Sequence, residues 1–117
     1  MEKEITNRSF DFSVRIVKLA EYLQSEKKEF MISKQVLRSG TSICANLTET
    51  EYAQSKADFI HKNAIALKEC AETRQWIKLL FHTDKVTEKE YKSLYTECEE
   101  ILKILVSIIK NSKKRNA

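Results

Sequence analysis

The two histidines are the residues from which metal chemistry would have to be built. A di-metal site in a helical protein needs a Glu-x-x-His motif on each of two helices and a further glutamate from each of the other two. Asp58-x-x-His61 is the nearest fragment of that pattern, whereas Leu79 stands three residues before His82, where a carboxylate is required. The ligand set is incomplete, so the sequence predicts no metal site and both histidines are interpreted as surface or internally satisfied residues.

Nucleophilic and phosphate-binding chemistry find no better support. Neither Ser39 nor Ser42 is expected to lie at the height of a histidine that could activate it. A single glycine leaves no Gly-rich phosphate loop. The three cysteines are odd in number and lack a CxxC pair, which predicts reduced, small apolar packing residues: Cys44, Cys70 and Cys98. The sequence therefore predicts no enzyme activity and no cofactor.

Composition then restricts the fold that must position the remaining polar residues. One glycine and no proline in 117 residues provide almost no material for tight turns, which disfavours strand-rich sandwiches and barrels. A hydrophobic fraction of 42% and a net charge of only +4 also disfavour disorder. No stretch approaches the ~18 apolar residues of a membrane span, and the N-terminus carries acids where a signal peptide would be basic. We expect one all-α cytoplasmic domain without a membrane partner.

Helical periodicity divides the chain into four predicted helices. The first follows Ser9 and covers residues 10–27, and the second covers residues 34–53 with Ser33 as its N-cap. Capping boxes at Ser55–Asp58 and Thr87–Glu90 open the third helix, over 56–82, and the fourth, over 88–110. Short connections predict an antiparallel up-down-up-down four-helix bundle over residues 1–112, followed by a basic tail at 113–117.

Two features inside these helices allow more than one interpretation. Gly40 costs about 1 kcal/mol relative to alanine in a helix, so the second helix could break there. However, the apolar series keeps its spacing across Gly40 and the flanking residues are small, which favours a continuous helix pressed against a neighbour. Asn63 and Thr73 occupy the apolar seam of the third helix, where they either set register or lie half exposed at its rim.

A polar network is predicted between the second and third helices. If these two helices form an antiparallel hairpin that turns near Gln54, residues whose numbers sum to about 107 lie at one height. Arg38 can then engage Glu69 or Glu72, and such pairs fix register more than they add stability. We assign the network a structural role in preference to a catalytic one, with these members: Gln35, Arg38, Asn46, Glu69 and Glu72.

The basic excess is concentrated at the C-terminal end of the chain. Residues 85–117 contain eight Lys or Arg and five acids, which accounts for three of the four net positive charges. Such a cluster favours phosphate contacts with a polyanion that do not read its sequence, although basic tails also serve as plain solubilising ends. The candidate nucleic-acid-binding residues are Lys110, Lys113, Lys114 and Arg115.

Three ordered strings of polar and small residues resemble a known bacterial family. They are Gln35-Val-Leu37-Arg38-Ser39-Gly40-Thr-Ser42-Ile43-Cys-Ala45-Asn46-Leu-Thr-Glu49, Ser55-Lys56-x-Asp58-Phe59, and Ala66-Leu-Lys-Glu69-x-x-Glu72-Thr73-x-x-Trp76. The chain resembles the four-helix-bundle proteins encoded in intervening sequences of ribosomal RNA genes. These are similar to the accessory variability determinant of diversity-generating retroelements.

The resemblance implies a homopentamer around a central channel, with a basic surface that contacts nucleic acid and no established enzyme activity. We therefore expect a non-enzymatic, oligomeric scaffold that binds RNA or DNA. The alternative is a protein-interaction module, such as an accessory partner of a reverse transcriptase. Its anchors would be the large aromatics Trp76, Tyr91 and Tyr95.

Overall fold

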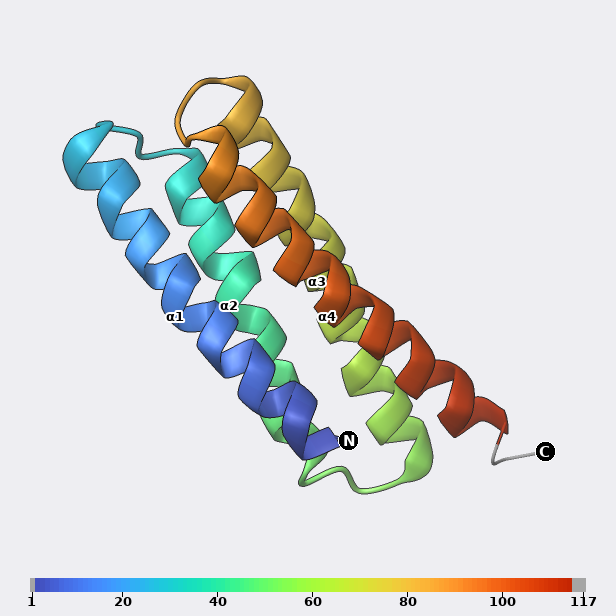
Figure 1. Ribbon diagram of the computed structural model, residues 1–117. Coiled ribbons are helices and arrows are strands. Elements are labelled where there is room, and N and C mark those ends of the chain that lie inside the picture. The colour runs from blue at the N-terminus through green and yellow to red at the C-terminus, as the bar shows by residue number, and fades with distance from the viewer. Residues whose placement is uncertain (1, 115–117) are drawn as a thin grey trace.

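Four antiparallel helices make up the described part of the chain (Figure 1). The computed structural model describes residues 2–114, with side chains from residue 4 onward. Its helices are α1 (Glu2–Glu26), α2 (Ile32–Thr50), α3 (Lys56–His82) and α4 (Glu88–Lys114). The α1–α2 and α3–α4 connections lie at one end of the bundle, and the start of α1, the α2–α3 connection and the end of α4 lie at the other. The predicted all-α up-down-up-down bundle is confirmed.

The core is one apolar stripe from each helix. Burying an aliphatic or aromatic side chain of this size stabilises the fold by about 1.5–3 kcal/mol relative to leaving it exposed. The largest fully buried apolar side chains are Ile5, Phe12, Ile16, Leu23, Val36, Ile43, Leu47, Ile77, Leu80, Ile101 and Leu105.

No helix within residues 2–114 is long and apolar enough to cross a membrane.

The first helix begins at Glu2, well before the predicted start at residue 10. The apolar spacing of its core stripe continues backward from Phe12 through Ser9 to Ile5, which is only 2% exposed. The Ser9 hydroxyl is buried and donates to the carbonyl oxygen of Thr6, 2.8 Å away in the preceding turn. A serine satisfied in this way can stand inside a helix, so it does not mark the helix start.

The second helix has a different cap from the predicted one. It begins at Ile32, so Ser33 lies inside its first turn and is buried. The carboxylate of Glu29 accepts hydrogen bonds from the backbone N–H groups of Met31, Ile32 and Ser33, at 3.2, 2.9 and 2.7 Å. A side chain that precedes the helix therefore satisfies N–H groups that the first turn leaves unpaired.

The second helix continues through Gly40, as its apolar spacing predicts. An ideal Cβ built on Gly40 would lie 2.8 Å from Cγ2 of Ile16 and 3.0 Å from its Cγ1. Ile16 belongs to α1 and is completely buried. Glycine is therefore needed at this position because it lets α1 approach the backbone of α2.

The third and fourth helices begin where their capping boxes predict. The Ser55 hydroxyl accepts from the N–H of Asp58, and the Thr87 hydroxyl accepts from the N–H of Glu90. The third helix has the predicted bounds, whereas α4 extends beyond residue 110 to Lys114 because Ser112 still packs against the bundle and is 8% exposed. Lys113 and Lys114 of the predicted tail belong to this last turn, and residues 115–117 lie outside the described residues.

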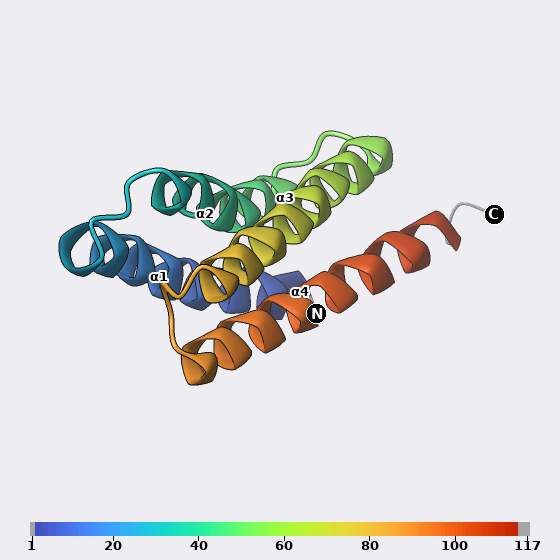
Figure 2. The same cartoon turned by 90° about the horizontal axis from the view of Figure 1, so that it is seen from above.

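The helices are not equally close to one another. The most extensive contact is between α2 and α3, and Figure 2 shows α3 and α4 extending beyond α1 at the C-terminal end of α4. The contact between α1 and α4 is the least extensive of the four neighbouring pairs. Near Ile5 and Ile104 a groove of about 490 Å³ separates them.

Candidate nucleic-acid interface

The predicted arginine network lies where α2 packs against α3. The guanidinium of Arg38 pairs with the carboxylate of Glu72 and lies 3.5 Å from that of Glu69. The indole Nε1–H of Trp76 donates to the same Glu72 carboxylate at 3.0 Å. Because the Arg38 side chain is 52% exposed, the pairs add little free energy, at most about 1 kcal/mol each. This arrangement fits a register-setting contact between two helices.

The other two residues assigned to this network do not join it. The Asn46 side-chain amide donates to the carbonyl and hydroxyl oxygens of Ser42, one turn earlier on its own helix. Gln35 is exposed, and no hydrogen bond among the described residues links it to Glu72. A polar link that the sequence left undecided lies nearby, because the Thr73 hydroxyl donates to the Ser39 hydroxyl at 2.8 Å.

The polar seam positions of α3 are buried and do not form a rim. Thr73 is 0% exposed and its hydroxyl joins α3 to α2. Asn63 is 1% exposed, and its amide donates to the carbonyl oxygen of Phe59 on its own helix. Of these two residues, only Thr73 makes the contact between helices that would set register.

The arginines of the described chain all pair with glutamates on other helices. Arg8 and Arg15 of α1 pair with Glu100 and Glu97 of α4. Arg74 of α3 pairs with Glu99 of α4 at 2.6 Å. With Arg38 paired to α3, no arginine within residues 4–114 is left without an acidic partner, so the unpaired cations exposed to solvent are mainly lysines.

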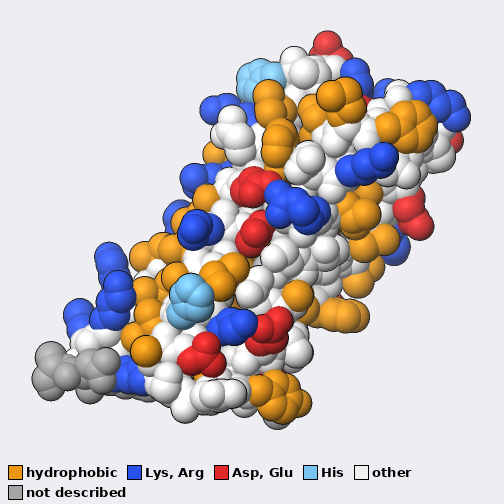
Figure 3. All heavy atoms as spheres, turned by 180° about the vertical axis from the view of Figure 1, so that it is seen from behind, with side chains coloured by type: hydrophobic (Ala, Val, Ile, Leu, Met, Phe, Trp, Pro, Cys, Tyr) orange, Lys and Arg blue, Asp and Glu red, His pale blue; other side chains and the backbone are white. Residues whose placement is uncertain are grey.

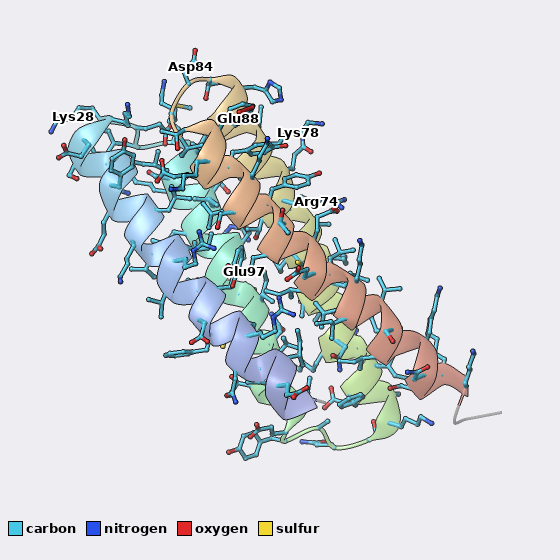
Figure 4. The ribbon with its side chains drawn as sticks, viewed as in Figure 1. Lys28, Arg74, Lys78, Asp84, Glu88 and Glu97 are labelled. Atoms are coloured by element: carbon cyan, nitrogen blue, oxygen red, sulfur yellow. The ribbon has the colours of Figure 1, made fainter. Side chains whose placement is uncertain are left out.

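Acidic and basic residues lie on different sides of α4. Glu97 and Glu100 turn toward the arginines of α1, and Glu90 shares a helix face with Glu97 because it lies seven residues before it. Figure 4 shows Glu97 on the α1 side of α4, with Arg74 and Lys78 on the far side. Most of the negative charge of α4 is therefore turned away from α3.

Outward positions at heptad spacing on α3 and α4 carry no acid. On α3 they are His61, Lys68, Gln75 and His82, and on α4 they are Lys89, Thr96, Lys103 and Lys110, all of them exposed. Lys92 lies seven residues before Glu99, and Lys113 lies fourteen residues after it. Both therefore share the row of α4 that contacts α3 through the pair between Glu99 and Arg74. Together these side chains form what we call the α3–α4 basic face, and its lysines are Lys68, Lys78, Lys89, Lys92, Lys103, Lys110 and Lys113.

The electrostatics of this face are strongly one-sided. The acids on it are Glu99, which Arg74 pairs, and Glu88 in the first turn of α4. The hydrogen bond from Arg74 to Glu99 raises the pKa of the Arg74 guanidinium, so Arg74 stays charged at any ordinary pH. Figure 3 shows blue side chains along one long edge of the molecule, whereas red ones gather over the middle of the face shown.

The sequence placed the basic cluster only at the end of the chain. Lys110 and Lys113 lie on the α3–α4 basic face, whereas Lys114 shares the row of Glu100 and therefore lies on the side of α4 toward α1. Arg115 lies outside the described residues. The missed lysines, such as Lys68 and Lys103, repeat the outward position of each heptad, which is the signal that could have found them.

The aromatic side chains near this face are already engaged with one another. Phe81 stacks on Tyr91 with ring centroids 4.5 Å apart and planes 8° apart, and Tyr91 contacts Tyr95 at 5.3 Å. Trp76 is half-buried and bonded to Glu72. The proposed protein-binding anchors thus serve contacts within the bundle. Among the described residues no group of three or more His, Cys, Asp or Glu could hold a metal ion.

Fold and surface together define a class of protein: a small antiparallel four-helix bundle whose described arginines pair with glutamates of neighbouring helices and whose α3 and α4 display lysines on one face. The chain belongs to the family of 23S rRNA-intervening sequence proteins, whose model matches residues 1–107. This confirms the resemblance noted from the sequence.

A solved structure is closely similar. It is the crystal structure of a protein with unknown function from the S23 ribosomal protein family of Bacteroides thetaiotaomicron. The two proteins are 51% identical, the match covers 93% of this chain and 97% of the other, and the TM-score is 0.91. No curated protein is similar enough to count as a relative.

Proposed function

We propose that the protein is a non-enzymatic, oligomeric scaffold of the cytoplasm that binds nucleic acid through the α3–α4 basic face. One observation carries the proposal: the charges of α4 are segregated, with Glu97 and Glu100 held by α1 and the lysines displayed on the outer side. Charge spread evenly around a helix would serve solubility alone. Lysines concentrated on one face instead create a local positive potential that attracts phosphates.

Binding through lysines predicts affinity that depends strongly on salt. Each phosphate that a lysine neutralises releases condensed counterions, so the slope of log K against log salt concentration steepens by about 0.9 for each contact on duplex DNA. The experiment is fluorescence anisotropy with labelled RNA and DNA at several salt concentrations. We expect binding at low salt that falls steeply as salt is added. Absence of binding to every probe by the folded protein would refute the proposal.

Matched variants assign the binding to a surface. Lys68→Gln, Lys103→Gln and Lys110→Gln together remove three charges from the α3–α4 basic face. The control combines substitutions of three exposed lysines elsewhere, Lys18→Gln, Lys27→Gln and Lys34→Gln. Both variants have the same net charge, so a loss of binding confined to the first would assign the contact to this face.

An exposed apolar stripe on α1 supports the oligomeric part of the proposal. Phe10, Val14 and Val17 are 60%, 40% and 39% exposed and follow the i, i+4, i+7 spacing of one helix face, nearly opposite the core stripe. A second copy of the chain is the occupant we propose, in the homopentamer that the family resemblance implies. Light scattering should give about five times 13.7 kDa, and Val14→Asp should lower that mass. A single species of 13.7 kDa would refute assembly.

A further inference from the structure

Resting on the proposed function, we infer that the α3–α4 basic face binds double-stranded nucleic acid and discriminates against single strands. Three features of this face favour a duplex: the spacing of its lysines, the absence of Phe, Tyr and Trp rings among them, and the shape of its surface. Each separates a rigid duplex from a flexible strand on physical grounds. Nothing in these features distinguishes RNA from DNA duplexes, so the shared chemistry is the phosphate backbone of a double helix.

Spacing favours a rigid polyanion. Lysines seven residues apart on α4, such as Lys103 and Lys110, are separated by about 10 Å along the helix axis. From Lys89 to Lys110 the row is about 30 Å long, close to the ~34–36 Å of one duplex turn. A duplex presents phosphates at fixed positions over that length, so several lysines can engage at once. A single strand must lose conformational entropy to match the same row.

Single-strand binding usually also needs aromatic rings on which bases stack, at about 1–3 kcal/mol per base. None of the eight heptad positions in the outward rows of α3 and α4 carries Phe, Tyr or Trp. The rings present there are the smaller imidazoles of His61 and His82, and the His82 ring contacts Phe81. The rings closest to these rows, Phe81 and Tyr91, are stacked on each other. The strongly exposed aromatic rings lie on α1 and on two connections, at Phe10, Phe30 and Tyr52.

The shape of the surface also favours a duplex, and its hydrogen-bonding groups favour binding without sequence preference. Single strands are typically held in a positively charged groove. The hollows between α1 and α4 and beside Tyr52 contain none of the lysines of the α3–α4 basic face. Base edges are read by bidentate contacts from Arg or Lys to guanine and from Asn or Gln to adenine, and Lys is the least directional of these because its ammonium is a point charge on a flexible stem. On this face Arg74 is held by Glu99 and Gln75 is the one planar group of this kind left, so we expect binding that depends little on sequence.

The experiment compares four probes of the same length, about 24 nucleotides: duplex DNA, duplex RNA and one single strand of each. Fluorescence anisotropy with the full chain at ~50 mM salt should give Kd values for the duplexes within about threefold of each other and for a second, scrambled duplex. Single strands should bind at least tenfold more weakly. The variant with Lys68→Gln, Lys103→Gln and Lys110→Gln should lose about three from the duplex salt slope.

The outcomes separate this inference from the proposed function. Equal or tighter binding of single strands would overturn the duplex preference and leave nucleic-acid binding standing. No binding to any probe would overturn both. A loss of duplex affinity in the Lys18, Lys27 and Lys34 control as large as in the first variant would show that net charge, and not the α3–α4 basic face, determines the binding, which also overturns the inference.

Discussion

Glu29 caps α2 from outside the helix, and this gives its carboxylate an acid-sensitive role. Burial by itself would raise the pKa of Glu29, but hydrogen bonds from the N–H groups of Ile32, Ser33 and Met31, with the charge of Lys85, lower it below the usual 4.5. A carboxylate with a lower pKa in the folded protein adds stability above its unfolded-state pKa. That contribution is lost as the pH falls through the folded-state value.

Replacing this carboxylate tests its contribution. Glu29→Gln keeps the shape but loses the charge and one acceptor, so we expect the free energy of unfolding to fall by about 1 kcal/mol at pH 7. Urea unfolding at pH 7 and at about pH 3 checks this, because the gap between wild type and variant should shrink in acid. Glu21→Gln, at an exposed site of α1, should change little. A gap that is constant with pH would contradict the charge-based explanation.

The three thiols should differ sharply in reactivity. The Cys70 and Cys98 sulfurs lie 3.6 Å apart in the core, and each thiol donates to the backbone carbonyl of the other residue. The hydrogen bond with Cys70, followed by burial, raises the pKa of the Cys98 thiol far above its usual value. Thiolate is the reactive form, so Cys98 should be inert. Cys70 should also be inert because its side chain is completely buried, whereas Cys44 is half-buried and more accessible.

Titration with a thiol-specific disulfide reagent measures this difference. The native protein should expose one reactive thiol, and all three should react in denaturant. The Cys44→Ser variant should expose none until it unfolds. Rapid reaction of more than one thiol in the native protein would mean that the α3–α4 core opens readily.

At the scale of the helices, Gly40 sets how closely α1 and α2 approach. Helix propensity alone predicts that Gly40→Ala stabilises by about 1 kcal/mol. The new Cβ would meet Ile16 at 2.8 Å, and Ile16 is a buried, β-branched side chain that cannot easily move aside. Overpacking costs about 1–3 kcal/mol, so we expect net destabilisation, measured as a lower Tm and a lower free energy of unfolding.

A second background shows whether the clash is the cause. Ile16→Ala removes the atoms that the new Cβ would meet, at a cost of its own of about 2–5 kcal/mol. In that background Gly40→Ala should become stabilising, because only the propensity gain remains. If Gly40→Ala has the same sign with and without Ile16, the close approach of α1 is not what requires glycine.

Sequence reasoning succeeded for the helices where the deciding interaction is local. The box from Ser55 to Asp58 marks the start of α3 because both partners lie within one turn. It failed for α2, where a glutamate preceding the helix supplies the cap, and Ser33 matched the expected residue type equally well. It failed for α1 because Ser9 inside the helix looks like a helix start until Ile5 is seen to be buried.

The candidate interface was only partly predictable for a different reason. Counting charges along the chain finds the cluster near Lys110, but not that Lys68 of another helix joins it. That requires knowing which side of α4 faces α3, and the pair from Arg74 to Glu99 shows it. The sequence also does not show which side of α4 its acidic residues occupy, because the arginines that pair with them belong to α1.

For the molecule as a whole, segregated charge has a cost in stability. Lysines about 10 Å apart repel each other by about 0.4 kcal/mol in water before screening. The Debye length shortens from about 30 Å at 0.01 M salt to about 8 Å at 0.15 M, so this repulsion acts mainly at low salt. The α3–α4 basic face therefore destabilises the folded chain when salt is low, and a bound polyanion would relieve it.

The same lysine variant tests this cost without any nucleic acid. Lysine and glutamine have similar helix propensities, so Lys68→Gln, Lys103→Gln and Lys110→Gln change charge with little other effect. Urea unfolding at 0.01 M salt should show a stabilisation on the order of 1 kcal/mol, which disappears above about 0.5 M as screening becomes complete. The Lys18, Lys27 and Lys34 control loses the same charge from sites outside this face, so its gain should be smaller. An equal gain in both variants would mean that the repulsion comes from net charge and that the lysines of the α3–α4 basic face are not specially crowded.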